Sequence, residues 1–443
     1  MSSRIPASLK LWQRAQELIP GGTQLVSRRP TRAAFGVSPI YASRARGARI
    51  WDVDGHEYVD WISGFGAIIL GYADPIVDEA VARQIELGVG YSLNHELEIE
   101  LAEELARRIP CAQMVRYCKG GGEACAIAVR IARGATGRDK VLVCGYHGWH
   151  DWYLAANLDA EIALDEHLFS GIEPIGVPRA LAGTTIPFPY GDLTALANKL
   201  DQLRGKVACV IMEPLRSELP PPGYLQGVAR LCREHGVVLI FDEITTGFRL
   251  HENGVEAYFG VTPDMAVFAK SISNGYPFGA VVGRREVMEQ AARMFISSTS
   301  WSDTIGLRAA LSTLREIERR SVPRALHAVG SKLQRRLSAA AKECGVPILC
   351  DGLIVHPRLT FEIADEKLRR DAALLYIQEM AKRGCHGFTS FYLNLCHGIG
   401  EIDDTVIGAT EAFRAIRRGL DKGDFGSLLE CQPQQEFFRR LVQ

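Results

Sequence analysis

Two charged residues follow neighbouring apolar runs in the middle of the chain. Asp242 follows the run 237–241, and Lys270 follows the run 265–269. If both runs are parallel strands, both side chains lie at the sheet edge where open α/β sheets bind ligands. Burial favours a neutral carboxyl group, so an acid there stays charged only when a cation or several donors contact it. A partly desolvated lysine keeps some neutral amine, which can attack a carbonyl group.

This pair suits a cofactor that carries both an aldehyde and a ring nitrogen. A protonated pyridine nitrogen is a cation that would meet Asp242, and an aldehyde would form an imine with Lys270. Pyridoxal phosphate (PLP) has both groups and needs the ring charge to withdraw electrons. The alternatives are a surface acid at a strand end and a lysine that reaches into solvent. Their placement after neighbouring runs favours the functional interpretation.

A glycine run precedes a predicted helix at residues 120–122. Residues without a Cβ let backbone N–H groups approach a phosphate, and a helix N-terminus adds a favourable partial charge. The run lacks the Gly-Lys-Ser/Thr ending of a nucleotide-binding loop, which excludes a kinase or ATPase of that class. A phosphate site and a plain tight turn both remain open here.

Aromatic and imidazole groups follow the apolar run 140–144. Tyr146 follows the run after Gly145, in a position suited to stacking on a flat ring. His147, His150 and Asp151 have a spacing that could hold a metal, but the sequence offers no second histidine cluster to complete the ligand set. We therefore expect no metal.

The elements that position these residues alternate between short apolar runs and helical stretches. The expected strands are 140–144, 207–212, 237–241, 265–269 and 279–283; the expected helices include 95–109, 123–134 and two after residue 305. This order predicts a mostly parallel sheet with helices on both faces. An Asp54-Gly55 turn within 41–62 predicts a hairpin. The stretch 152–189 is either a lid or a static surface excursion.

Composition indicates an ordinary globular protein. The 443 residues include 51 basic and 52 acidic side chains, a balance that does not favour nucleic acid or a membrane surface as partner. The start, Met1-Ser-Ser-Arg-Ile-Pro, lacks an apolar signal core. Eleven scattered cysteines contain no CxxC pair, and Cys125, Cys144, Cys209 and Cys232 have the apolar neighbours of buried thiols. We expect a cytoplasmic location.

Several segments, in their order and spacing, resemble the class III aminotransferases, and most closely the branch like glutamate-1-semialdehyde aminomutase. They are Ile19-Pro-Gly-Gly22, Asp52-Val-Asp-Gly55, Ile69-Leu-Gly-Tyr72, Tyr146-His-Gly-Trp-His-Asp151, Glu213-Pro214, Asp242-Glu-Ile-Thr-Thr-Gly-Phe-Arg249, Lys270 and Glu401-Ile-Asp403. The resemblance implies a fold-type I PLP fold with a large domain of seven strands and a smaller α+β domain built from both chain ends. We expect 1–60 and 311–443 to form the small domain and 61–310 the large PLP-binding domain.

The resemblance also implies a role for individual residues. Lys270 would hold the cofactor covalently and shuttle a proton, Asp242 would pair with the pyridinium, Ile244 would lie under the ring and Tyr146 above it. The further cofactor contacts it implies are Gly121, Gly122, His147, Glu213 and, reaching the phosphate of a neighbouring subunit, Thr299. Homodimers with shared active sites are expected.

Departures from the family pattern concern the substrate. The family's hydroxyl-bearing phosphate loop has become Gly120-Gly-Gly, and the aminomutase glutamate position falls on Thr389. Arg28 stands where the aminomutases hold the substrate carboxylate, although a solvated basic patch explains it equally well. Phe65 and Trp149 complete the candidate substrate contacts.

These departures favour a ping-pong aminotransferase that moves an amino group from a donor, expected to be an amino acid, to another carbonyl compound. The cofactor would alternate between PLP and pyridoxamine phosphate. The alternatives are an aminomutase such as a glutamate-1-semialdehyde 2,1-aminomutase, a racemase or epimerase, or a non-catalytic PLP-binding protein. Retention of both Lys270 and Asp242 argues against the last, because binding alone has little use for that pair.

Overall fold

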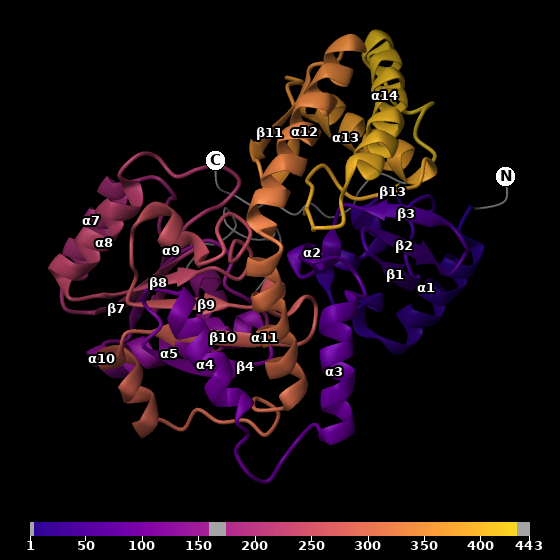
Figure 1. Cartoon of the computed structure of the whole chain (residues 1–443). Coiled ribbons are helices and arrows are strands. Elements are labelled where there is room, and N and C mark those ends of the chain that lie inside the picture. Colours follow the sequence, from indigo (N-terminus) through magenta and orange to yellow (C-terminus); the bar gives the residue numbers. More distant parts are fainter. Residues whose placement is uncertain (1–3, 159–173, 432–443) are drawn as a thin grey trace. The chain divides into compact units, whose positions relative to one another are not determined.

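The computed structural model describes residues 4–158 and 174–431 and divides the chain into two compact units (Figure 1). One unit combines residues 4–74 with 324–431, so it is built from both chain ends, and the other consists of residues between 75 and 323. The middle of the predicted lid at 152–189, residues 159–173, lies outside the described residues.

The larger unit is built on one seven-stranded sheet, in the order β4-β10-β9-β8-β7-β5-β6. Its strands are β4 (Met114–Cys118), β5 (Lys140–Cys144), β6 (Thr185–Pro187), β7 (Val207–Met212), β8 (Val238–Asp242), β9 (Met265–Phe268) and β10 (Gly279–Gly283). The neighbours from β6 to β9 pair in parallel. Only β10 runs the other way, antiparallel to both β4 and β9. The prediction of a mostly parallel sheet in an α/β fold is therefore confirmed, and six strands end at the same edge.

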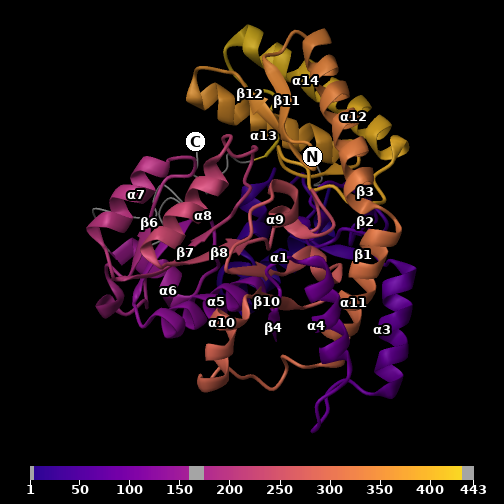
Figure 2. The same ribbon diagram turned by 60° about the vertical axis from the view of Figure 1, so that its left-hand side comes forward.

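Helices flank this sheet. They are α3 (Pro75–Leu87), α4 (Leu97–Arg108), α5 (Gly121–Thr136), α6 (Asp151–Leu154), α7 (Leu193–Gln202), α8 (Tyr224–His235), α9 (Gly254–Phe259), α10 (Arg285–Met288) and α11 (Thr304–Arg319). Helix α5 contacts β4 and the four strands from β7 to β10, while α8 contacts β8 and lies beside α7 (Figure 2).

The core of the larger unit follows from strand periodicity. Side chains alternate between the two faces of a strand, so every second residue points to α5. Cys209 and Ile211 of β7, with Val238 and Ile240 of β8, join the cluster that α5 buries. Cys125, Ala128 and Ala132 lie on the apolar side of α5 in the same cluster. The small side chains on α5 let its axis lie close to the strands, and this fixes its first turn at the sheet edge.

The unit formed by both chain ends has two smaller sheets. Its strands are β1 (Ala42–Arg46), β2 (Arg49–Asp52), β3 (Glu57–Asp60), β11 (Ile348–Leu353), β12 (His356–Phe361) and β13 (Cys385–His386), and its helices are α1 (Pro6–Leu18), α2 (Ser63–Gly66), α12 (from Val322–Glu343), α13 (Glu366–Lys382) and α14 (Ile399–Lys422). Strands β2 and β3 pair antiparallel around the predicted Asp54-Gly55 turn. The second chain end enters the same sheet because β13 pairs with β3 in parallel.

Residues 61–74 belong to this unit, although the sequence analysis placed them in the large domain. The reason is hydrogen bonding to the C-terminal part of the chain. Ser63 Oγ donates to the Tyr392 carbonyl at 2.8 Å, and the Leu395 amide donates to the Ile69 carbonyl at 2.8 Å. Loops carry no hydrophobic periodicity, so such pairing leaves no mark in the sequence.

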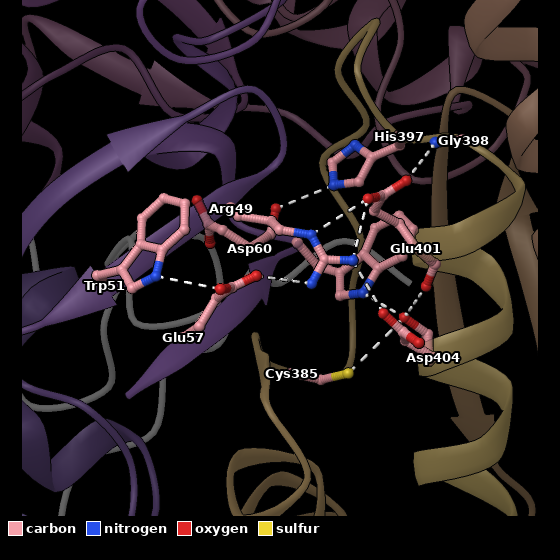
Figure 3. A network of polar contacts seen from close by, with 11 residues as sticks. Arg49, Trp51, Glu57, Asp60, Cys385, His397, Gly398, Glu401 and Asp404 are labelled. Carbon is pink, nitrogen blue, oxygen red and sulfur yellow. Dashed lines mark hydrogen bonds and ion pairs between the residues drawn. The ribbon is translucent and has the colours of Figure 1, made fainter. Parts of the chain in front are cut away.

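A polar network also joins the two chain ends (Figure 3). Arg49 of β2 donates to Glu57 at 2.9 Å and, in α14, to Glu401 at 3.1 Å and Asp404 at 2.9 Å. The buried indole of Trp61 donates to Thr405 Oγ1 at 2.9 Å. These contacts give the Glu401-Ile-Asp403 segment a structural role in holding α14 against the small sheet.

Two strands of the large sheet were not predicted. β4 has the sequence MVRYC with half-buried polar positions, and β6 has only three residues and contains a proline. Short edge strands with proline give a weak pattern, and proline is tolerated at an edge because no donor is needed there. No helix among the described residues has the length and apolar character that a membrane crossing requires.

Candidate active site

Asp242 ends β8 and is 2% exposed. Its Oδ2 accepts from His147 Nδ1 at 2.7 Å and from the Cys125 thiol at 3.4 Å, and its Oδ1 accepts from the Ile244 amide at 3.0 Å. A carboxylate has about four acceptor positions in total. Three are therefore filled, and one on Oδ1 has no partner among the described residues. Several donors meet this acid, as the sequence argument required of a buried anion.

Burial dominates the neighbouring acid, Glu243. Glu243 is completely buried; its Oε2 accepts from the Val255 amide at 2.7 Å, and its Oε1 has no partner in the described chain. Burial raises the pKa of Glu243 to about 8, and the nearby Glu256 carboxylate adds to the shift. For Glu243 burial therefore outweighs the donors that meet its carboxylate, and the neutral form is favoured.

The loop after β5 brings an imidazole and a phenol to this edge. The ring of His147 is fully buried against Asp242, and its Nε2 has no hydrogen-bond partner in the described residues. Tyr146 is 40% exposed, and its amide donates to Glu213 Oε2 at 3.2 Å. Glu213 directly follows β7, so it holds the Tyr146 backbone at the end of the neighbouring strand. Tyr146 therefore lies next in sequence to His147, whose ring contacts Asp242.

Lys270 follows β9, the neighbour of β8. Asp242 is in register with Val267, so Lys270 lies three positions past the residue opposite Asp242. The lysine has φ of 52°, a left-handed conformation that non-glycine residues seldom adopt. Its Nζ donates to Thr245 Oγ1 at 3.0 Å. Backbone strain of this kind concentrates at functional sites, where the surrounding structure enforces it.

The glycine run begins α5 and touches two of the other segments. A Cβ on Gly121 would lie 2.7 Å from Ile244 Cδ1, and a Cβ on Gly148 would lie 2.8 Å from the Cα of Gly122. Glycine is needed at both contacts because any side chain would separate the segments. The run therefore packs directly against the Asp242 segment and the Tyr146 loop, with the first N–H groups of α5 beside them.

Two possible metal sites fall near these residues. His147, His150 and Asp151 are not gathered, because His147 faces Asp242 while the His150 ring stacks on Trp149 at 4.6 Å. Cys125, His147 and Asp242 are gathered. However, His147 Nδ1 and Asp242 Oδ2 are only 2.7 Å apart, whereas bonds of about 2.0–2.3 Å to tetrahedral zinc keep ligand atoms more than about 3 Å apart. The distances describe hydrogen bonding.

Thr299 and Trp149 lie in the same unit but at its surface. Thr299 is exposed in the segment between β10 and α11, and Trp149 is 71% exposed. The structure shows neither of them contacting the Asp242 group. Their expected contacts, with a neighbouring subunit and with substrate, stay predictions.

The other candidate substrate contacts lie in the unit built from both chain ends. Arg28 ends the short helix Val26–Arg28 and is exposed. Phe65 is the third of four consecutive left-handed residues, 63–66, in α2. The Thr389 carbonyl accepts from the Leu359 amide at 2.7 Å, which ties it to β12. Three of the four substrate candidates therefore belong to one unit and Trp149 to the other.

Sequence analysis missed two residues of the site. Cys125 was interpreted only as a buried thiol; it is buried and free, as are Cys144, Cys209 and Cys232, but it also contacts Asp242. Thr245, the partner of Lys270, was passed over. Helical spacing places Cys125 one turn beyond Gly121, which is the only signal that could have drawn attention to it.

The described residues fit PLP. The site offers a lysine amine beside a threonine hydroxyl, a buried carboxylate with one acceptor position left, and a helix N-terminus lined by glycines. These are the three groups that an aldehyde, a pyridinium and a phosphate require. None of them depends on a residue outside the larger unit.

Comparison with known proteins agrees with this chemistry. Residues 33–352 match the Aminotransferase class-III family. A 3-aminobutyryl-CoA aminotransferase of Cloacimonas acidaminovorans (strain Evry) is 35% identical, covering 94% of this chain and 99% of that protein. A glutamate-1-semialdehyde 2,1-aminomutase of Syntrophobacter fumaroxidans is 33% identical, covering 92% of this chain and 97% of that protein.

A solved structure shares the fold along almost the whole chain. The omega-transaminase from Sphaerobacter thermophilus superimposes with a TM-score of 0.80 at 28% identity, covering 93% of this chain and 98% of that one. Sequence family, fold and the group around Asp242 and Lys270 lead to the same conclusion. The chain belongs to the class III aminotransferases, a family of PLP-dependent enzymes.

Proposed function

We propose that this aminotransferase uses Lys270 to hold PLP and to move a proton, and Asp242 to keep the cofactor ring nitrogen protonated. The observation that carries the proposal is the hydrogen bonding of Asp242. Three donors support a buried carboxylate, and its Oδ1 keeps one acceptor position. A structural acid has no need of an unused acceptor position, whereas a partner for a pyridinium does.

Each residue has a separate task in the reaction. PLP supplies the electron sink that makes a carbon–hydrogen bond beside the amine acidic. Lys270 Nζ accepts that proton and returns it, and Thr245 Oγ1 orients the amine by accepting its hydrogen bond. Asp242 Oδ1 holds the proton on the ring nitrogen, since a nearby anion favours the protonated form.

Binding of the phosphate falls to the start of α5. Gly121 and Gly122 present backbone N–H groups that have no partner within the helix, and the helix dipole favours an anion there. Gly120, the residue before the helix, provides no side-chain cap, so these donors stay available to the ligand. The missing hydroxyl groups make the backbone donors the main support.

A homodimer is the proposed working form. Large apolar side chains are exposed on the larger unit, with Leu87 at 73%, Leu93 at 84% and Phe295 at 85%. Exposed apolar side chains on this scale favour a protein partner, and the family resemblance favours a second copy. Thr299 lies in the same segment as Phe295, in accordance with a contact to the neighbouring phosphate. Light scattering after size-exclusion chromatography should give the dimer mass, and a monomer at micromolar concentration would contradict this part.

The proposed location is the cytoplasm. All eleven cysteines of the chain are free in the structure. Free thiols persist in reducing compartments, where disulfides are rare. Fractionation of the host cell tests the location directly.

A β-amino acid or its thioester is the first donor class to test. The relative from Cloacimonas acidaminovorans is named for an amine on carbon 3 of an acyl-CoA, and it covers almost the whole of this chain. An aminomutase reaction is the second candidate, because a glutamate-1-semialdehyde aminomutase is almost as similar. The two differ in a measurable way, since an aminomutase loaded with pyridoxamine phosphate isomerises its substrate without any external donor or acceptor.

The absorption spectrum of the purified protein with PLP tests the proposal. The lysine-bound cofactor should give a visible band that a suitable donor bleaches and a keto acid restores. Lys270→Ala should lack that band and lose turnover while it still folds. Turnover in Lys270→Ala at the normal rate would exclude Lys270 as the proton-transfer group.

A further inference from the structure

Cys125 occupies a special place among the buried thiols of the larger unit. It lies one turn into α5, it is completely buried, and its Sγ lies 3.4 Å from Asp242 Oδ2. The glycine run at the start of α5 and the thiol therefore face the same site from one rigid helix. Cys209 in β7 is equally buried, but it has no hydrogen bond to the site.

The thiol acts as a hydrogen-bond donor to the carboxylate. Burial and the negative charge of Asp242 raise the pKa of Cys125 well above its usual value, so sulfur keeps its proton. An ionised carboxylate can only accept, so both the thiol and His147 Nδ1 must donate to it. The thiol is a weak donor. Its hydrogen bond to Asp242 is buried, however, and hydrogen bonds are stronger in the protein interior than in water.

These two donors act on the same oxygen. With His147 and Cys125 on Oδ2, both acceptor positions of that oxygen are filled, whereas Oδ1 has only the Ile244 amide. The unequal filling leaves Oδ1 as the oxygen able to accept another donor. Loss of the thiol would open a position on Oδ2 as well, and the carboxylate would lose a donor that favours its charged form.

We propose that Cys125 is a positioning residue that acts through Asp242: it fills Oδ2, so that Oδ1 accepts a hydrogen bond from the protonated ring nitrogen of the cofactor. This inference rests on the proposed function, because it assumes that Asp242 faces that nitrogen. With Cys125, a residue of α5 joins Asp242 among the residues that set the protonation of the cofactor ring nitrogen. The helix that binds the phosphate would thereby also set the acceptor for the opposite end of the cofactor.

The test compares Cys125→Ala with Cys209→Ala, a matched control that removes a buried thiol from the same core without touching Asp242. The first readout is the dissociation constant of PLP from each protein. We expect roughly a threefold to tenfold weakening in Cys125→Ala, the range for one lost hydrogen bond of ordinary strength, because a thiol is a weak donor, and no change in Cys209→Ala. Equal melting temperatures of the two variants show that neither result comes from unfolding.

The second readout is the protonation of the ring nitrogen itself. With PLP labelled by 15N in the ring, NMR follows the pH at which that nitrogen loses its proton. Cys125→Ala should lower this pH by about half a unit to one unit, which corresponds to the same threefold to tenfold change. Cys125→Ser, which keeps a donor on a shorter bond, should fall between Cys125→Ala and the wild type.

The outcomes separate the two proposals. If Cys125→Ala and Cys209→Ala titrate alike, or if the serine variant behaves no better than alanine, Cys125 has no positioning role. Asp242→Asn serves as the reference for the function itself. If Asp242→Asn also leaves the ring nitrogen protonated at neutral pH, then the proposed pairing of Asp242 fails, and the inference about Cys125 falls with it.

Discussion

Two buried aspartates in the two units have the same exposure but different surroundings. Asp52 ends β2 and Asp242 ends β8, and each is 2% exposed. Asp52 accepts four hydrogen bonds: Oδ1 from the Asp54 and His56 amides, and Oδ2 from His56 Nδ1 and the Tyr58 hydroxyl. Asp242 accepts three. Asp52 is saturated, whereas Asp242 keeps one position.

The origin of the donors differs as well. Every donor to Asp52 lies within six residues of it, inside one hairpin. The side-chain donors to Asp242 come from residues 95 and 117 positions away in sequence. A locally saturated acid stabilises a turn, because its contacts form together with the hairpin. An acid assembled from distant elements and left with spare capacity is organised to receive a ligand.

The largest expected effect is on the activity of Asp242→Asn. Removing the charge that holds the ring proton should lower kcat/KM on the order of 1,000-fold. The unfolding free energy should fall by only about 1 kcal/mol, since one donor, the Ile244 amide, meets the new amide group. Steady-state kinetics and thermal unfolding check both values. Full turnover of Asp242→Asn with normal PLP binding would show that Asp242 is a structural acid like Asp52.

Acid lability of the chain-end unit is the next effect. His397 is buried with both ring nitrogens engaged: Nδ1 accepts from the Asn394 amide, and Nε2 donates to the Asp60 carbonyl. Burial lowers its pKa to about 4. The unfolded chain therefore binds more protons between pH 4 and pH 6.5.

Stability from His397 is complete above pH 6.5 and is lost as the pH falls to about 4, with a total of about 3 kcal/mol. Denaturant unfolding at several pH values measures how the unfolding free energy of the unit built from both chain ends depends on pH; His397 of this unit is labelled in Figure 3. His397→Gln, which cannot titrate, should have a flatter profile over that range. An equally steep profile in His397→Gln would assign the lability to other groups.

Asp52→Asn should show the opposite pattern to Asp242→Asn. The amide group would face two of the four donors, at a cost of about 2 kcal/mol in unfolding free energy. The dissociation constant of PLP should stay unchanged, because the hairpin has no role in holding the cofactor. Chemical denaturation and a PLP titration measure the two quantities, and weaker PLP binding without loss of stability would contradict the comparison.

The smallest expected effect concerns the histidine that contacts each aspartate, His56 for Asp52 and His147 for Asp242. His56 is 32% exposed at its side chain, so His56→Ala should cost less than about 1 kcal/mol and leave activity intact. His147 is buried, and His147→Ala should lower kcat/KM about tenfold or more through Asp242. Kinetics of both variants under identical conditions test the contrast. Equal activity would show that the buried histidine does not act on the site.

Much of the larger unit was readable from sequence because local rules decide it. Apolar runs of four to six residues gave five of the seven strands, and the Asp54-Gly55 pair gave the hairpin. The direction of β10 was not readable, since an apolar run has the same pattern in either direction. Strand β6 escaped because three residues at a sheet edge carry too little periodicity.

The sequence by itself determined which residues could do chemistry: an acid and a lysine after neighbouring strands, a glycine run before a helix, and a phenol after a third strand. Only the tertiary structure decided how they act together. The donors to Asp242 come from α5 and from the loop after β5, and nothing in their local sequence refers to residue 242. Hydrogen bonds form or fail with changes of a few tenths of an ångström in the donor–acceptor distance. The packing of α5 on the sheet sets these distances. That packing leaves one oxygen of Asp242 able to accept a further hydrogen bond.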